Sequence, residues 1–445
     1  MKGVTKMTTQ EQQSSLQMGI ARTDITPPVG IPMVGFAGRG PSIGVHDPLF
    51  ATALVVTDGE KKATLIGCDL LDLGAAVVED VRKEIDARKL GIQPGHVTIS
   101  CTHTHYGPDS YRSESSSDVA AYRANLIYKL AGIVQEAAAN MQAVRLGVGW
   151  GVSDIGINRR EKRPDGQIVL GKNPDGPIDR QVGVLRLDKE DGTPLACLVN
   201  FACHPVSQGG RMQLISADFP GKMRDVVEQL IGAPCLYLQG ACGNINSIML
   251  EHSYEPARTL GTRLGCEVVK VWETIETAEA VGIAVASETV SLPQIMYGSE
   301  AEAEALTKNL TQQLEQLKAS GAHEGSIYWA QRRLERTSQA LESWRTGKPL
   351  QPIAVELQAW RLGTFGFATA PGEVFNEIGT AIKQRSPLKN TFFLGYTNGS
   401  IGYVPTAKSY PEGGYEVTHA CRVNPEAEEI ITEGCLRLLH AVSEF

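Results

Sequence analysis

An apolar pentapeptide that runs directly into two histidines constrains this chain most. Residues 97–101 read VTISC, and residues 102–105 read THTH. Successive side chains of a β-strand point to opposite faces, so His103 and His105 are expected to project to one face where the strand ends. Two imidazoles placed together can hold a metal ion and a reacting group side by side. The alternative is a pair of hydrogen-bonded histidines at the edge of a core, and other parts of the chain must decide between the two.

Other apolar runs also lead into groups that can bind a metal. His204 closes one such run and stands before a proline, which cannot continue a central strand. Glu373 comes shortly after another run, behind a proline that suits a first helical turn, so it is expected at a helix start. A further run, 391–396, gives way to the glycine-containing segment 397–403. Open α/β sheets place their sites beyond strand ends, so these positions together favour a functional site.

Strand-like and helix-like segments are mixed along the chain. We expect strands near 51–56, 63–68, 97–102, 145–150, 183–188, 195–203, 235–238, 282–291, 353–360, 364–369 and 391–396. We expect helices near 75–89, 118–140, 219–231, 255–274 and 373–385, and a last helix that begins with Asn424 as its cap and Pro425 at its first position. This order predicts an α/β fold of mixed α+β character, with a large mixed β-sheet flanked by helices.

The charged segment 299–346 stands apart from the rest. Apolar residues recur at helical spacing on both sides of Ser320-Gly321, which predicts an antiparallel helical hairpin inserted into the fold. Its apolar faces could pack on the same chain or bury surface between two copies in a homo-oligomer, and we expect packing on the same chain. The first helix carries Leu306, Leu310, Leu314 and Leu317.

Charge and hydropathy exclude several classes of partner. The 445 residues carry a formal net charge of −8, which argues against nucleic acid and gives no sign of an anionic membrane surface as a target. No run of about 18 apolar residues occurs, so no transmembrane helix is expected. Residues 1–17 are polar and lack an apolar core, which predicts a disordered leader and not a signal peptide. We expect residues 18–445 to form a single catalytic domain.

The cysteines indicate the compartment. The chain has nine of them, an odd number, and many stand inside apolar runs. Buried free thiols in a reducing cytoplasm explain this usage better than a disulfide framework does. A cytoplasmic location is therefore expected.

In combination, several short motifs resemble the catalytic domain of the neutral/alkaline non-lysosomal ceramidases. The resemblance extends over roughly residues 18–440, and the polar leader together with the cysteine usage makes the chain look like a short, intracellular member of that family. The motifs are 20–28 (IARTDITPP), 102–108 (THTHYGP), 157–159 (INR), 201–205 (FACHP), 216–218 (SAD), 371–373 (PGE) and 403–406 (YVPT).

The resemblance implies a zinc site. Members of the family hold one Zn²⁺ ion through two histidines, a glutamate and a tyrosine, which by position are His103, His204, Glu373 and Tyr403. The resemblance also implies that His105 acts as proton donor or acceptor and that Arg159 holds an oxyanion or a carboxylate.

The sequence departs from the family in the segment 239–247. The serine that serves as nucleophile in the family corresponds to Asn246 here, with Ser247 one residue later and Cys242 four residues before Asn246. Without that serine, we expect attack by a water molecule that zinc activates. Asn244 and Asn246 are expected to stabilise the oxyanion.

These observations predict a zinc-dependent hydrolase. Its substrate is expected to be a small molecule that carries an acyl chain, cleaved at an amide bond of the kind found in ceramide, or at a related ester or lactone. Two alternatives remain open: a metal-dependent lyase or other non-hydrolytic enzyme on the same scaffold, and a binding protein that has lost catalysis.

Overall fold

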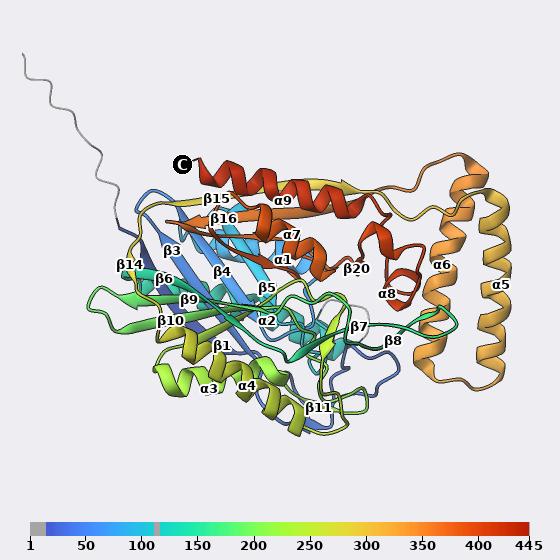
Figure 1. The fold of residues 1–445 in the computed structure, drawn as a ribbon, viewed down its shortest axis with the longest axis horizontal. Helices are drawn as coiled ribbons and strands as arrows, with labels where there is room; N and C mark the ends of the chain where they lie inside the picture. The colour runs from blue at the N-terminus through green and yellow to red at the C-terminus, as the bar shows by residue number, and fades with distance from the viewer. Residues whose placement is uncertain (1–14, 111–115, 445) are drawn as a thin grey trace, which may run out of the picture.

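Two β-sheets face each other at the centre of the molecule (Figure 1). The computed structural model describes residues 15–110 and 116–444. The larger sheet has nine strands. Eight of them run in the spatial order β12 (Cys235–Gln239), β10 (Pro194–Phe201), β9 (Gln181–Lys189), β6 (Gln142–Val152), β1 (Gln17–Asp24), β3 (Phe50–Thr57), β4 (Lys62–Cys68) and β5 (Val97–Cys101), and β14 (Ala278–Glu279) pairs with β6.

The second sheet has four strands and is mixed. β15 (Ile283–Leu292), β16 (Ile353–Leu362) and β17 (Phe365–Thr369) are antiparallel neighbours, and β19 (Asn390–Leu394) runs parallel to β17. Smaller pairings connect the loops: β2 (Gly44–Val45) with β11 (Leu214–Ile215), β7 (Gly156–Lys162) with β8 (Ile168–Asn173) and β13 (Ile245–Ser247), and β18 (Glu373–Val374) with β20 (Tyr403–Val404).

Strand β3 shows why the larger sheet is buried on both faces. Leu54 and Val56 point into a cluster shared with Trp360 and Phe367 of the smaller sheet. The alternate side chains, such as Val55, belong to a second cluster on the opposite face. Period-two alternation with apolar residues on both sides is the pattern of a strand that lies between two layers.

Helices cover the outer faces of both sheets. The side chains of α1 (Ala75–Ala87), α2 (Ser117–Ala139), α3 (Asp218–Ile231) and α4 (Glu255–Trp272) share a core cluster with the larger sheet. Those of α7 (Asn376–Arg385) and α9 (Ala427–Ser443) share one with the smaller sheet. The result is a four-layer α/β/β/α arrangement, which confirms the predicted fold class. Single 3-10 turns lie at Pro94–His96 and Ala407–Ser409.

The predicted helical hairpin is present and extends to one side of the layers (Figure 1). It consists of α5 (Glu300–Ala319) and α6 (Glu324–Thr346), and α6 contacts the short helix α8 (Tyr415–Thr418) of the same chain. Within residues 15–110 and 116–444, none of the helices combines the length and hydropathy needed to cross a bilayer.

Local expectations at the ends of elements are wrong in three places. The last helix, α9, begins at Ala427 with Glu426 before it, so Asn424 is not its cap and Pro425 is not its first residue, although Asn424 Oδ1 accepts from the backbone of Glu426 at 3.1 Å. Glu373 does not begin a helix: it lies in β18, and α7 starts at Asn376, because Glu373 first pairs in register with Tyr403. The predicted leader 1–17 is too long, since Leu16 is fully buried and Gln17 opens β1. Residues 1–14 lie outside the described part of the chain.

Candidate metal centre

The side chains that can bind a metal gather where strands of both sheets end. His103 follows β5, His204 follows β10, and Glu373 follows β17, each within a few residues of the strand. The carboxyl ends of these strands meet at one edge of the two-sheet core, which is where α/β folds place their sites. His103 and His204 are both almost completely buried, and His105 is partly exposed.

The two histidines of the THTH segment come together through a turn. β5 ends at Cys101, and His103 takes a left-handed backbone with φ of 66°, so the alternation of the strand does not extend to it. A positive φ is uncommon outside glycine and costs energy that the surrounding structure must offset. The rings of His103 and His105 nevertheless lie 4.8 Å apart at 88°. They meet as expected, for a different geometric reason.

Backbone carbonyls fix the tautomers of all three histidines. Nδ1 of His103 donates to the carbonyl of Leu71 at 2.8 Å, and Nδ1 of His204 donates to that of Cys242 at 2.7 Å. His105 donates in the same way to Gly35 at 3.0 Å. With the proton on Nδ1, each Nε2 presents a lone pair, which is how metal-binding histidines are oriented.

The three Nε2 atoms converge on one point, together with a carboxylate. His103 Nε2 lies 3.2 Å from His105 Nε2, and the potential ligand atoms of His103, His105 and His204 all lie within 4.8 Å of one another. Oε2 of Glu373 lies 3.4 Å from His103 Nε2 and 3.0 Å from His204 Nε2. Burial raises the pKa of Glu373, but its contacts with the two histidines outweigh that effect and hold the pKa well below its usual range. Glu373 is therefore a carboxylate.

Tyr403 completes the cluster from the neighbouring strand. β18 and β20 are parallel, and Glu373 is the register partner of Tyr403. The Tyr403 hydroxyl accepts a hydrogen bond from Arg159 Nη2 at 2.7 Å. Burial raises the pKa of the phenol well above 10, although the charge of Arg159 acts in the opposite direction. To ionise, Tyr403 therefore needs a further positive charge beside it.

The donor set fits a metal cation. Lone pairs on three Nε2 atoms and a carboxylate oxygen that face one another repel unless a positive charge lies between them. Imidazole nitrogen and carboxylate oxygen are ligands that zinc accepts. Burial, followed by the charge of Arg159, lowers the pKa of His204 to about 4, so its imidazole is neutral and able to bind a metal at neutral pH.

Arg159 lies beside this cluster. Its Nη1 lies 3.3 Å from His204 Nε2 and donates to Oδ1 of Asn246 at 3.2 Å. On the other side its Nε donates to Glu416 at 2.8 Å. Arg159 is almost fully buried, so its positive charge is directed at the centre with little screening.

Asn246 and Ser247 are neighbours on β13 and therefore face opposite sides. Asn246 faces Arg159 and accepts its hydrogen bond through Oδ1, which leaves the Nδ2 group turned away from Arg159. Among the described residues, no acceptor bonds that Nδ2 group, and the side chain is partly exposed. Ser247 is buried behind His204, where its hydroxyl donates to the His204 carbonyl at 2.9 Å.

Asn244 and Cys242 lie nearby but have other partners. Oδ1 of Asn244 accepts from the backbone and the side chain of Asn376, both at 2.9 Å, and its Nδ2 donates to Glu377 at 2.8 Å. The expectation that the Asn244 side chain serves the oxyanion is therefore corrected: it joins the turn before β13 to α7. Cys242 lies 3.0 Å from the Tyr396 hydroxyl, and burial raises the pKa of its thiol well above 9, so it stays protonated.

Two residues of the site escaped the sequence analysis. The ring of Tyr415 lies 5.8 Å from that of Tyr403, and burial together with the charge of Glu373 raises its pKa, so it keeps its proton. Glu416 bonds both Arg159 and Arg160. Both stand in a glycine-rich loop on the single turn α8, where neither hydrophobic periodicity nor a strand end marks them.

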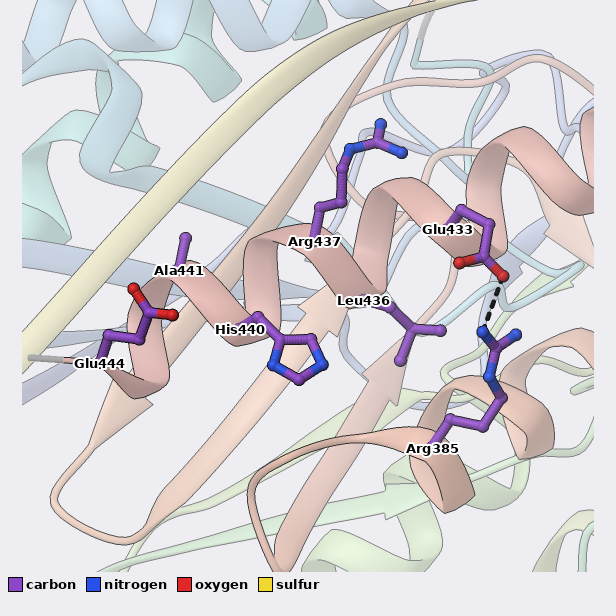
Figure 2. A pocket seen from close by; sticks show the side chains of 7 residues that line it. All are labelled: Arg385, Glu433, Leu436, Arg437, His440, Ala441 and Glu444. Carbon is purple, nitrogen blue, oxygen red and sulfur yellow. Dashed lines mark ion pairs between the residues drawn. The ribbon is translucent and has the colours of Figure 1, made fainter.

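A hollow lies away from the histidines, between α7 and α9 (Figure 2). It measures about 440 Å³, and Arg385 and Glu433 pair at 2.8 Å on its wall. Arg437 is paired with Glu288 at 2.7 Å. Both arginines of this hollow are therefore held in ion pairs, and the hollow is not the candidate site. The remaining lining residues are Leu436, His440, Ala441 and Glu444.

The chain is similar in sequence to known proteins. Residues 16–235 match the family described as neutral/alkaline non-lysosomal ceramidase, N-terminal. Neutral ceramidase A of Dictyostelium discoideum is 28% identical over 226 residues, which are 47% of this chain and 31% of that protein. Neutral ceramidase B of the same organism is 26% identical over 238 residues, 50% of this chain and 33% of that protein. The aligned region spans about a third of the length of these curated relatives.

Solved structures share the fold. Neutral ceramidase from Pseudomonas aeruginosa superposes with a TM-score of 0.74 at 19% identity, over 97% of this chain and 75% of that one. A ceramidase complexed with C2 gives a TM-score of 0.76 at 18% identity, over 97% of this chain and 76% of that one.

Proposed function

Because the chain belongs to the neutral/alkaline non-lysosomal ceramidase family, we propose that it is a zinc-dependent hydrolase that cleaves the amide bond of ceramide or of a related N-acyl substrate. The observation that carries the proposal is the convergence of His103, His204 and Glu373 on one point, with Tyr403 beside them. In this proposal these four residues hold the metal. When bound, zinc polarises a carbonyl and lowers the pKa of a water molecule from about 15.7 to about 7.

Arg159 and Asn246 are suited to the charge that develops on the carbonyl oxygen. The guanidinium of Arg159 is buried, and the free amide of Asn246 lies on the same side of β13. Donors that are fixed before the reaction stabilise an oxyanion without having to reorganise. Tyr415, which keeps its proton, stands within reach of the same region.

His105 is placed to move the proton. It is the partly exposed member of the three histidines, and the carbonyl of Gly35 holds its proton on Nδ1, so its Nε2, which lies 3.2 Å from His103 Nε2, carries the lone pair that would accept a proton. In the proposed reaction the oxygen of a water molecule bonds to the carbonyl carbon, and the carbon–nitrogen bond breaks. His105 passes one proton of that water to the leaving nitrogen, and the second proton of the water is released to solvent, which gives a carboxylate and an amine.

The nucleophile in this proposal is water, because the described residues at the centre offer no available serine. Ser247 is turned behind His204, and the Cys242 thiol is protonated and in contact with Tyr396. The position that faces the centre on β13 belongs to Asn246.

The cytoplasm is the compartment that we propose. All nine cysteines are free thiols, and eight of them are buried. Free thiols persist in a reducing environment. We propose a small molecule with an acyl chain as the reaction partner.

Metal analysis followed by a substrate panel tests the function. The purified protein is expected to contain about one zinc ion per chain and to release fatty acid from N-acyl sphingosines, with loss of activity on chelation and recovery with zinc. The panel includes esters and lactones, so that the scissile bond is identified. Bound metal with elimination products would make the protein a lyase, and absence of both metal and turnover would make it a binding protein.

A further inference from the structure

Helix α8 is too short to hold its own shape. It has four residues, Tyr415–Thr418, and Gly413 and Gly414 before it have positive φ angles of 69° and 90°. A single helical turn fixes several dihedral angles for very few hydrogen bonds, so it is unstable alone. Yet this turn carries Glu416, which bonds Arg159 at the metal centre. Contacts from outside α8 must therefore fix its position.

Helix α6 of the inserted hairpin supplies these contacts. Nη2 of Arg336 donates to the carbonyls of Thr418 and His419, which end α8 and have no partner within a helix this short. At the other end of α8, the Trp329 ring lies edge-on to that of Tyr415 at 5.7 Å and 86°. The hairpin thus holds both ends of the turn.

The hairpin is itself fixed on the opposite side of the centre. Gly325, in the first turn of α6, packs so closely on the loop at Ala37 that an added Cβ would lie 2.5 Å from the Ala37 carbonyl oxygen. Two residues before Ala37, the Gly35 carbonyl accepts from His105. Helix α6 therefore contacts both the loop at Ala37 and helix α8, and it lies beside α8 (Figure 1).

Glu416 transmits this support to Arg159. Its carboxylate is 1% exposed and accepts from Arg159 Nε at 2.8 Å and from Arg160 Nη1 at 2.9 Å. A guanidinium is planar, so a fixed Nε sets the plane in which Nη1 and Nη2 lie. Those two groups point to Asn246, His204 and Tyr403.

We infer that Glu416 is the positioning residue of Arg159, and that the hairpin holds Glu416 in place through Arg336 and Trp329. The inserted hairpin then has a function in the reaction, although none of its residues bonds the converging metal ligands. The inference rests on the proposed function only where its test measures activity on an N-acyl substrate.

A double-mutant cycle tests it. Glu416→Gln keeps the shape and removes the charge, and we expect a loss of about 10²-fold in kcat/KM with zinc content unchanged, as for a catalytic group displaced by a fraction of an ångström to an ångström. In an Arg159→Ala background the same change should cost less than about two-fold, because its effect passes through Arg159. A loss of equal size in both backgrounds would overturn the inference, since a general structural role is additive.

Variants on the hairpin keep the test decisive if Glu416→Gln fails to fold. Arg336→Ala and Trp329→Ala should lower kcat/KM in the wild-type background but not in the Arg159→Ala background. Trp344→Ala is the matched control: it lies on the same helix, its Nε1 donates to Tyr297, and it is about 22 Å along the axis from Trp329. Equal losses from Trp329→Ala and Trp344→Ala would overturn the role of the hairpin.

A crystallographic readout separates this inference from the proposed function. The distance from Arg159 Nη2 to the Tyr403 hydroxyl is 2.7 Å, and it should lengthen in Arg336→Ala and stay the same in Trp344→Ala, whether or not any substrate is turned over. If no N-acyl substrate is hydrolysed, the proposed function fails while this distance still decides the positioning role. An unchanged distance in Arg336→Ala would overturn the inference.

Discussion

Glu373 and Tyr403 are register partners on two parallel strands of two residues each. Residues opposite each other in a parallel pair send their side chains to the same face, so the carboxylate and the phenol reach the histidine cluster together. Strand β18 follows the smaller sheet, whereas His103 and His204 follow the larger one. The candidate centre therefore depends on how the two sheets face each other.

Loss of one ligand should remove the metal without unfolding the chain. In His204→Ala we expect zinc content to fall sharply, while the far-ultraviolet circular dichroism spectrum stays that of the wild type, because the site lies beyond the strands. Elemental analysis of the purified variant measures this. Full zinc occupancy in His204→Ala would show that His204 is not a ligand.

His105 should affect the rate and not the metal. Replacement by alanine is expected to lower kcat by about 10²–10⁴-fold, the contribution typical of a general acid or base, with zinc content unchanged. His103→Ala, its neighbour at 4.8 Å between rings, serves as the control that loses metal. Equal loss of metal in both variants would make His105 a ligand.

Alanine variants in and just before β13 should differ in activity, depending on whether the replaced side chain faces the metal centre. Asn246→Ala is expected to lose about 10²–10³-fold in kcat, because an oxyanion donor is removed. Ser247→Ala and Cys242→Ala should keep most of their activity. Steady-state kinetics on one N-acyl substrate compares the three. An acyl adduct on Ser247 in the mass spectrum of the reacting enzyme would contradict attack by water.

Asp218 should make stability depend on pH. Burial raises its pKa to about 7, despite hydrogen bonds from Ser207 and from the backbone of Phe219. An unfolded aspartate titrates near 3.9, so between about pH 4 and pH 7 the folded state holds a proton that the unfolded state has released. The Asp218 contribution to the free energy of unfolding is therefore greatest below about pH 4 and falls as the pH rises to about 7.

Thermal unfolding of the wild type and of Asp218→Asn across this range checks the sign. The difference between the two melting temperatures should change between about pH 4 and 7 and level off above, because only the wild type titrates there. A constant difference over the whole range would show that the pKa of Asp218 is not raised in the folded protein.

The long elements of this fold could be predicted from sequence. Apolar runs such as 97–101 and 194–201 become buried strands, and α5 and α6 form where the spacing of apolar residues predicts them. β1 (Gln17–Asp24) was missed because its polar and apolar residues do not stand out as a run. β18, of two residues, could not be predicted, because its pairing is with a segment about 30 residues away.

Site residues could be predicted where a single side chain follows a strand. They were harder to predict where the conformation of a loop determines which side chains meet. His103, His204 and Glu373 each follow a strand and come together. Asn244 was expected at the oxyanion, but its partners Asn376 and Glu377 lie more than 100 residues along the chain, and only the folded contacts reveal them. Glu416 is defined by its bond to Arg159 across a separation of 257 residues.

The opposite orientation of Asn246 and Ser247 on β13 bears on how such enzymes diverge. An exchange of serine and asparagine at position 246 alters one side chain and leaves every neighbour in register, so lineages can pass between the two states by point substitution. A one-residue deletion in the preceding turn would instead move Ser247 into the inward position and would also displace the carbonyls that orient His204. The inward-facing position of β13 can therefore change its chemistry without any change in the fold around it.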